Sequence, residues 1–559
     1  MIGDCPEWMG YILGNGKKNN NYLIQGTILV IASFVARAIG MIYRIPLTRI
    51  LGAQGNAYYS TANEIYAIIL MISSFSLPLA VSKLVSERLH KGQKKNAHKV
   101  FICALKFGLL AGGIMSLLTF ALSGVITKFM KFEMAAFALR VLSPAIFIYA
   151  VVGVLRGFFQ GHETMVPTAV SQVLEQIINA VVSVAGAALL IGYGTKLGEQ
   201  KGNDSLGPAY GAAGGTLGTV VSITVALLFL MFIYVTYQRN FRRQMRRDHT
   251  RKTESDKAIY HALIVTILPV ILSTVIYNIS TVIDQGIFGS VLSGQGYSEK
   301  EYSTVWGIFV EFKVLMNVPL SIASCLAPSV VPSLTASMIE EDYRAAGIKV
   351  RDSIRYTMVF TIPCAVGLAA LASPVMQLVY GDSSALAAGI MQSGALMIVL
   401  YALSTLTTGI LQGLGEMQKP LIHSAIALVL HIIVLLLMLT FSGMNIYSVV
   451  YANIFFALVI CILNAWAIRR TIGYRQELLR TFIIPVFVSG IMGIAAYGIY
   501  RLFALFAGVL ISTVIAILAG MVIYVVLLVK LHGITEREIR GLPKGAYIAY
   551  ILHRCRVLP

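Results

Sequence analysis

Residues 508–529 read GVLISTVIAILAGMVIYVVLLV, which is 22 consecutive positions without a charged side chain. A helix needs roughly 20 apolar residues to cross about 30 Å of hydrocarbon, so this stretch can span a membrane. Comparable runs recur along the chain of 559 residues, of which 57% are hydrophobic and 12% charged, against about 25% charged in soluble proteins. Because the runs are continuous and do not alternate, they favour a bundle of spanning helices over a β-barrel.

The apolar runs predict an all-α membrane protein with about fourteen transmembrane helices, arranged as two groups of six and a C-terminal helical hairpin. The predicted spans are residues 22–43, 57–80, 100–122, 134–159, 166–193 and 211–237, then 259–288, 305–334, 356–380, 385–411, 422–441 and 446–468, and finally 481–505 and 508–529. The corresponding regions are an N-terminal segment 1–21, a first lobe 22–257 that includes a basic loop, a second lobe 258–480, the hairpin 481–531 and a basic tail 532–559.

The basic residues set the expected orientation. The chain has a formal net charge of +19, and its Lys and Arg residues gather after the second, sixth, eighth and twelfth predicted spans and in the tail. The positive-inside rule then places these loops and both termini in the cytoplasm. Because the charge is spread over loops and does not form one soluble face, we expect no nucleic-acid partner. A basic tail beside a cytoplasmic leaflet is instead expected to meet anionic membrane lipid.

The sequence gives no indication of an enzyme. It contains no Walker-type glycine loop, no HExxH and no GxSxG motif, so we expect no catalytic residues. Its six cysteines show neither CxxC nor any paired spacing, and neither a metal site nor a disulfide framework is expected. A membrane-embedded glycosyltransferase would be expected to carry acidic catalytic residues in a large external loop, and the predicted external loops are short. A transporter without a cofactor is the favoured class.

Two copies of one motif indicate an internal repeat. The sequence RGFFQG at residues 156–161, followed by Pro167, recurs as TGILQG at residues 408–413, followed by Pro420. Both copies fall between the fourth and fifth predicted spans of their group, on the cytoplasmic side. The sequence therefore predicts two lobes related by a parallel pseudo-repeat, with a shared central cavity as in many transporters.

Ionisable side chains inside predicted spans are the candidate site residues, since each costs roughly 2.5–3.5 kcal/mol at the centre of a bilayer. Arg37 and Arg44 are seven residues apart and share a helical face with Ser33 and Gly40. This face is expected to line a cavity. The alternative is that these arginines, Arg44 above all, extend to the membrane surface.

Polar residues in other spans give further candidates. Gln172 and Glu175 belong to a stripe with Gln176 and Asn179 at helical spacing, which either faces the lobe interior or hydrogen-bonds a neighbouring helix. Glu64 and Asp284 are carboxylates that could bind a proton or a metal cation. For these two, the alternative is a structural ion pair with a cation such as Arg37.

The eighth predicted span contains Glu311, Lys313 and Asn317. Glu311 and Lys313 are two residues apart and point to different sides, whereas Lys313 and Asn317 share a face. A cation in the second lobe and Arg37 in the first predict a positive cavity. Such a site suits a cargo with a pyrophosphate group, and the inside-negative membrane potential favours outward movement of an anionic head by about 2.3 kcal/mol per charge per 100 mV.

Three segments carry a family resemblance: FVARAIG at 34–40, PLAVSK at 78–83, and RGFFQGH at 156–162 continuing to PTAVSQ at 167–172. They resemble the polysaccharide-transport family of the multidrug/oligosaccharidyl-lipid/polysaccharide (MOP) exporter superfamily, in particular the MurJ-like lipid II flippases and the SpoVB-like sporulation proteins. The likeness runs over essentially the whole chain. It implies a two-lobed, V-shaped bundle in a bacterial plasma membrane, which exposes a cationic cavity alternately to either side.

The leading interpretation is a flippase for lipid II, the undecaprenyl-pyrophosphate-linked peptidoglycan precursor. The alternatives are a flippase for another lipid-linked polysaccharide, such as a capsule or spore-cortex precursor, or a cation-coupled multidrug exporter, which usually has twelve spans and an acidic cavity. Movement could be coupled to the membrane potential, H⁺ or Na⁺, and cell-wall synthesis proteins are the expected partners. The candidate substrate-binding residues are Arg37, Arg44, Arg156, Lys313 and Asn317, and the candidate coupling or cavity residues are Glu64, Gln172, Glu175, Asp284 and Glu311.

Overall fold

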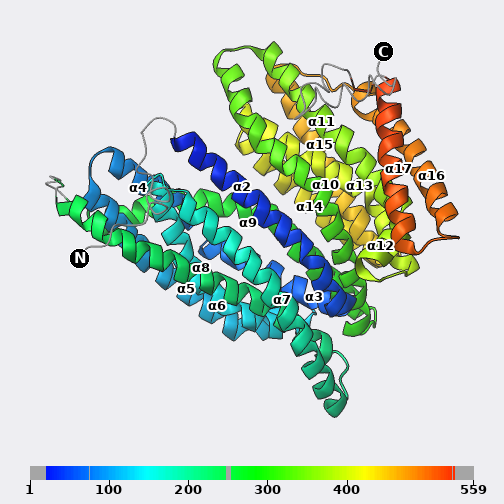
Figure 1. The fold of residues 1–559 in the computed structure, drawn as a ribbon, viewed down its shortest axis with the longest axis horizontal. Helices are drawn as coiled ribbons and strands as arrows, with labels where there is room; N and C mark the ends of the chain where they lie inside the picture. The colour runs from blue at the N-terminus through cyan, green and yellow to red at the C-terminus, as the bar shows by residue number, and fades with distance from the viewer. Residues whose placement is uncertain (1–20, 75, 247, 249–252, 532, 535–559) are drawn as a thin grey trace. The chain divides into compact units, whose positions relative to one another are not determined.

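The computed structural model describes residues 21–74, 76–246, 248, 253–531 and 533–534, and these are helical apart from short connections (Figure 1). By contacts the chain divides into two compact units, Met1–Gly307 and Ile308–Pro559. The predicted N-terminal segment 1–21 and basic tail 532–559 lie, except for residues 21, 533 and 534, outside the described residues.

The helices follow the chain in simple order. The first unit contains α2 (Asn21–Ile42), α3 (Arg44–Ser73), α4 (Leu77–His90), α5 (Lys94–Phe129), the 3-10 turn η1 (Glu133–Ala135), α6 (Ala136–Gly161), α7 (Val166–Lys201), α8 (Leu206–Arg246), α9 (Asp256–Gly294) and the first residues of α10 (Glu299–Ile339). The second unit contains the rest of α10, then α11 (Tyr343–Ala370), α12 (Ala372–Tyr380), α13 (Ala385–Gly413), α14 (Gln418–Phe441), α15 (Ile446–Ile472), the π-turn η2 (Leu479–Ile483), α16 (Ile484–Phe503) and α17 (Val509–Lys530).

The predicted helical membrane fold is confirmed. Within the described residues, 12 helical segments are long and apolar enough to cross a membrane. They correspond to every predicted span except the first and the seventh, which are the 22-residue α2 and the 39-residue α9. Both of these helices exceed the roughly 20 residues that a span needs, so the observed helices agree with a count of about fourteen.

The first two predicted spans join in a way that the sequence did not indicate. Tyr43 follows α2 in a right-handed helical conformation and its N–H donates to the Ile39 carbonyl at 3.1 Å, so the helical path continues into α3. The bend comes later, at Gly52, where φ is +64°. Glycine adopts this left-handed conformation without the steric cost that a Cβ would impose. Arg44 is therefore the first residue of α3, on the helical continuation of α2.

The repeated motif has the same structural role in both units. Gly157 and Gly161 let α6 approach α4, since a Cβ on Gly157 would lie 2.7 Å from the Pro78 carbonyl oxygen. In the second copy a Cβ on Gly409 would lie 2.8 Å from Cβ of Ala327 on α10. Small residues at such crossings allow membrane helices to pack closely. The first motif thus packs α6 against α4, and the second packs α13 against α10.

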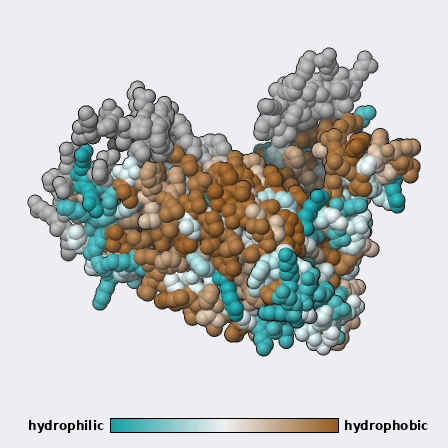
Figure 2. Space-filling view, turned by 60° about the horizontal axis from the view of Figure 1, so that its bottom comes forward, coloured by the Kyte–Doolittle hydropathy of each residue, from teal (hydrophilic) through white to brown (hydrophobic). Residues whose placement is uncertain are grey.

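Apolar side chains cover much of the outer surface. Leu117 on α5 is 72% exposed and Val522 on α17 is 64% exposed. Figure 2 shows one face of the molecule, on which apolar residues form a broad surface and hydrophilic residues gather toward its margins. Because water would disfavour so much exposed apolar surface, this arrangement fits a protein surrounded by lipid.

The lobe boundary expected at residue 257 differs from the division of the chain at Gly307. The difference arises because α9 is bonded to helices of the first unit. The Gln285 amide of α9 donates to the Thr61 hydroxyl of α3, and Glu254, just before α9, pairs with Arg88 of α4. By contacts, α9 thus belongs with the helices that precede it.

Candidate functional site

A buried ion pair joins α6 to α7 in the first unit. Arg156, only 5% exposed, donates from Nη2 to Glu175 Oε2 at 2.8 Å and from Nε to Ser171 Oγ at 3.0 Å. Ser171 and Glu175 are four residues apart on α7 and therefore face the same neighbour. The guanidinium of the repeated motif is thus neutralised by a carboxylate of the predicted polar stripe. Arg156 can contact an anionic ligand only when this pair opens.

The rest of the stripe faces α2. Ser33 of α2 donates to Gln172 Oε1 at 3.3 Å, and Asn179 Nδ2 donates to the Tyr43 hydroxyl at 3.0 Å. Gly40 lies between these two contacts, and a Cβ there would be 3.4 Å from Gln176 Oε1. The polar faces that the sequence predicted on α2 and α7 therefore lie against one another. The interhelical hydrogen bonds that the sequence left as an alternative are present.

Arg37 differs from Arg156 in its surroundings. It lies on α2 between Ser33 and Gly40, its side chain is exposed, and it makes no hydrogen bond or ion pair to any residue that the structure describes. Arg44 is half-buried, with its guanidinium carbon 5.6 Å from the centre of the Tyr59 ring, within the range of a cation–π contact. Arg37 is therefore the accessible cation of this polar face.

The predicted carboxylates of the first unit are less accessible. Glu64 is half-buried and accepts a hydrogen bond from Ser60 Oγ at 3.5 Å. Asp284 is 3% exposed on α9. Within the described part of the chain neither forms an ion pair with Arg37, which was one of the cations considered for them.

In the second unit the candidates lie together on α10. Lys313 is half-buried, with Nζ 5.8 Å from the centre of the Phe309 ring, and Asn317 is exposed. Glu311 is 3% exposed, and its Oε2 has no hydrogen-bond partner among the described residues. The Tyr380 hydroxyl donates to the Glu311 backbone carbonyl at 3.2 Å, which attaches the end of α12 to this helix. On this helix the carboxylate is therefore buried and the lysine is more exposed.

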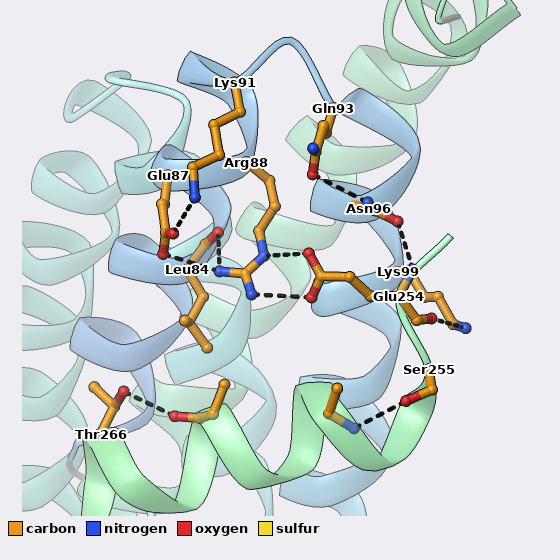
Figure 3. A network of polar contacts seen from close by, with 12 residues as sticks. Leu84, Glu87, Arg88, Lys91, Gln93, Asn96, Lys99, Glu254, Ser255 and Thr266 are labelled. Atoms are coloured by element: carbon orange, nitrogen blue, oxygen red, sulfur yellow. Dashed lines mark hydrogen bonds and ion pairs between the residues drawn. The ribbon is translucent and has the colours of Figure 1, made fainter. Parts of the chain in front are cut away.

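A second polar cluster was not anticipated from the sequence. Arg88, near the end of α4, is 9% exposed and makes two hydrogen bonds to Glu254, from Nε to Oε1 at 3.2 Å and from Nη2 to Oε2 at 3.0 Å (Figure 3). The Glu254 amide donates to Asn96 Oδ1 at 3.1 Å, and Lys99 pairs with Asp256 at 2.8 Å. These contacts tie the segment before α9 to α4 and α5.

The sequence contains one signal for this cluster. Arg88 follows Val81, Leu84 and Val85 at positions i+7, i+4 and i+3, which places it on the apolar face of α4. A cation on a buried face needs a partner, whereas the other cations of this loop are compatible with solvent. The positive-inside rule uses only the number of basic residues in a loop and does not distinguish a buried cation from a solvated one.

No group of three or more His, Cys, Asp or Glu side chains that could hold a metal ion occurs among the residues with described positions.

Comparisons with known proteins agree with this architecture. The family described as "Polysaccharide biosynthesis protein" matches residues 23–338. The lipid II flippase MurJ of Bacillus subtilis (strain 168) is 23% identical over 492 residues, which cover 85% of this chain and 87% of that protein. Stage V sporulation protein B of the same organism is also 23% identical, over 93% of this chain and 97% of that protein.

Solved structures show the same fold. A lipid II flippase MurJ in an inward closed conformation matches with a TM-score of 0.62 and 16% identity, covering 90% of this chain and 98% of that one. An inward-facing multidrug resistance MATE family transporter of the MOP superfamily matches with a TM-score of 0.55 and 17% identity, covering 78% and 98%. By their names, these two proteins are a flippase and a transporter. The chain belongs to the polysaccharide biosynthesis protein family and has the fold of the MOP-superfamily transporters.

Proposed function

We propose that this protein is a flippase that moves lipid II, the undecaprenyl-pyrophosphate-linked peptidoglycan precursor, from the inner to the outer leaflet of a bacterial plasma membrane by alternating access. The similarity to a lipid II flippase over 87% of that protein's length supports the proposal. Membership of the polysaccharide biosynthesis protein family supports the broader class of lipid-linked glycan as cargo.

The observation that carries the proposal is the accessibility of the candidate charges. Arg37 is exposed and unpaired among the described residues, whereas Glu311 and Asp284 are each 3% exposed and Glu175 is engaged by Arg156. A pyrophosphate requires cations or aimed donors, and a guanidinium can bind its oxygens in a bidentate manner. A chain in which this cation is accessible while these three carboxylates are buried or paired therefore suits an anionic head group. The same distribution disfavours a cationic drug as cargo.

A second candidate cargo is another lipid-linked polysaccharide precursor, of a capsule or the spore cortex. The similarity to a stage V sporulation protein over 97% of its length favours this alternative. Both cargoes carry the same kind of diphosphate, so Arg37 would serve either one. The glycan itself has to be distinguished by experiment.

The proposal includes an orientation and an energy source. The distribution of Lys and Arg over the loops supports an orientation with both termini in the cytoplasm. Outward movement of the anionic head is favoured by the membrane potential, at about 2.3 kcal/mol per charge per 100 mV. Coupling to H⁺ or Na⁺ is a further part of the proposal, and cell-wall synthesis proteins are the proposed partners.

The test is flipping by the purified full-length chain in liposomes. Fluorescent lipid II, a second undecaprenyl-pyrophosphate-linked glycan and a cationic dye would be compared in parallel vesicles. We expect lipid II to become accessible at the opposite leaflet faster than in protein-free vesicles, and the dye to remain in place. Preferential movement of the second glycan would replace lipid II as the cargo, and movement of the dye alone would contradict the flippase proposal.

A further inference from the structure

The second unit contains a cavity of about 420 Å³ at the end of α15, beside η2. Its inner wall includes Ile354, Thr407, Cys461 and Ile468, all of which are at most 7% exposed. Ile354 and Ile468 belong to the hydrophobic core of this unit. The cavity therefore reaches from the surface into the core, and its volume lies in the range of about 300–1,000 Å³ usual for small-molecule sites.

The polar groups on the inner wall already have partners. Thr407 Oγ1 donates to the Leu403 carbonyl at 2.8 Å and accepts from Asn464 Nδ2 at 3.0 Å. Cys461 Sγ donates to the Leu400 carbonyl at 3.4 Å. Because these groups are satisfied within the protein, they offer little to a polar ligand. The interior of the cavity suits an apolar chain.

The mouth of the cavity has the opposite character. Arg469 and Arg475 line it, and both are exposed and form no hydrogen bond or ion pair through their side chains to the described residues. The neighbouring acids are committed elsewhere, since Asp352 pairs with Arg351 at 3.0 Å and Glu477 lies 3.9 Å from Arg480. Two guanidinium groups therefore remain available to an anion at the entrance.

The exposed Trp466 indicates the depth at which the cavity mouth lies in the membrane. Trp466 lines the cavity and is 52% exposed, and the Arg470 guanidinium carbon lies 3.9 Å from the centre of its ring. Exposed tryptophan and clustered arginine are typical of the boundary between hydrocarbon and the cytoplasmic head groups. The cavity is thus placed where a lipid could put a chain inside and its phosphate at the mouth.

We propose that this cavity binds an anionic membrane phospholipid, with part of one acyl chain inside and the phosphate group held by Arg469 and Arg475. The cationic entrance selects an anionic over a zwitterionic lipid. This site is separate from the flippase proposal and does not depend on which glycan is moved.

The test is native mass spectrometry of the purified full-length protein with phosphatidylglycerol or phosphatidylethanolamine added in equal amounts. Three variants would be compared with the parent: R469Q/R475Q, the cavity-filling A465F, and the control R242Q/R243Q, which removes two exposed arginines from α8. Soluble glycerol 3-phosphate added as a competitor distinguishes a lipid site from a simple phosphate site. Size-exclusion profiles and helical circular dichroism of each variant establish that the protein is folded.

We expect the parent to retain phosphatidylglycerol in preference to phosphatidylethanolamine, and R469Q/R475Q to weaken retention by about tenfold or more, from the loss of two cations near a lipid head group. A465F should weaken retention as well, and R242Q/R243Q should leave it unchanged. Equal retention of both lipids, parent-like retention by R469Q/R475Q and A465F, or displacement by glycerol 3-phosphate would each overturn the proposal.

Discussion

Arg156 Nη2 lies 2.8 Å from Glu175 Oε2, so the arginine of the repeated motif in α6 is held by the polar stripe of α7. Both side chains are largely buried, with side-chain exposures of 7% and 18%. A buried pair of this kind stabilises little compared with apolar residues of the same shape, but removal of one partner leaves an uncompensated charge. Arg156 is also a candidate substrate-binding residue, so the pair can affect function as well as stability.

Replacing one partner should destabilise the protein, and replacing both should largely restore it. For E175Q we expect a loss toward the lower end of about 3–5 kcal/mol, since Glu175 is partly exposed. R156M/E175M should recover most of the loss because no buried charge remains. Thermal unfolding in detergent measures both, with E199Q, an exposed glutamate of the same helix, as the control. If the R156M/E175M variant is stable and flips lipid II at the parent's rate, Arg156 is not a substrate-binding residue.

The motif glycine of α6 should not tolerate a methyl group. In G157A the new Cβ would lie 2.7 Å from the Pro78 carbonyl oxygen and 2.8 Å from Val81 Cβ, so we expect a loss of about 1–3 kcal/mol from overpacking. The matched control is G192A on α7, where a Cβ would meet nothing within 4 Å. This control should be neutral or slightly stabilised because alanine favours the helix. Equal unfolding temperatures for the two variants would contradict the assigned packing role.

His162, in the short connection after α6, should make stability depend on pH. Burial lowers the pKa of His162 to about 4 from its ordinary 6.5, although a hydrogen bond to the Phe158 carbonyl at 2.8 Å opposes this shift. As the pH falls, His162 is therefore protonated in the unfolded chain at a higher pH than in the folded protein. The stability that neutral His162 contributes is complete above pH 6.5 and is lost between pH 6.5 and 4.

Replacing this histidine should therefore make the unfolding temperature depend less on pH below pH 7. In H162F the unfolding temperature should fall less between pH 7 and 4.5 than it does in the parent. The difference in the loss of unfolding free energy should be up to about 3 kcal/mol. H90Q, which changes an exposed histidine nearby, is the control. Parallel pH profiles for H162F and the parent would show that another group governs the loss.

The Arg88–Glu254 pair should hold the segment before α9 in place. Lysine cannot reproduce the two bonds from Nε and Nη2, so R88K should leave Glu254 weakly held. We expect backbone amides of residues 253–260 to exchange with deuterium about tenfold faster or more, in line with the loss of charge-assisted hydrogen bonds. K91Q, which removes an exposed partner of Glu87, should change exchange at this segment little. Unchanged exchange in R88K would mean that other contacts position α9.

The sequence predicted the fold well because its signals are local. Uncharged runs of about 20 residues determine where helices can span, and the repeated GxxxG spacing of Gly157 and Gly161 determines a close crossing. The same spacing recurs at Gly409 and Gly413, which also approach a neighbouring helix closely. These features depend on a few neighbouring residues and so can be read without a structure.

The site was less accessible to sequence reasoning because its properties depend on which helices face one another. Arg156 and Glu175 were both candidates, but their pairing depends on the rotation of α6 against α7. Spacing placed Gln172 and Asn179 on one face without indicating that α2 covers it. The pairing of Arg88 was not predicted because its partner, Glu254, lies 166 residues away in the sequence. Contacts of this range have no local signature.

The most direct test of the account concerns Arg37, the exposed cation of the α2 face. Lipid II binding and flipping would be measured for R37Q beside the parent and K128Q, an exposed cation at the end of α5. We expect R37Q to unfold like the parent, because Arg37 has no partner among the described residues, but to bind lipid II about tenfold or more weakly and to flip it correspondingly more slowly. Parent-like binding and flipping by R37Q would contradict the proposed role of this cation in holding the diphosphate.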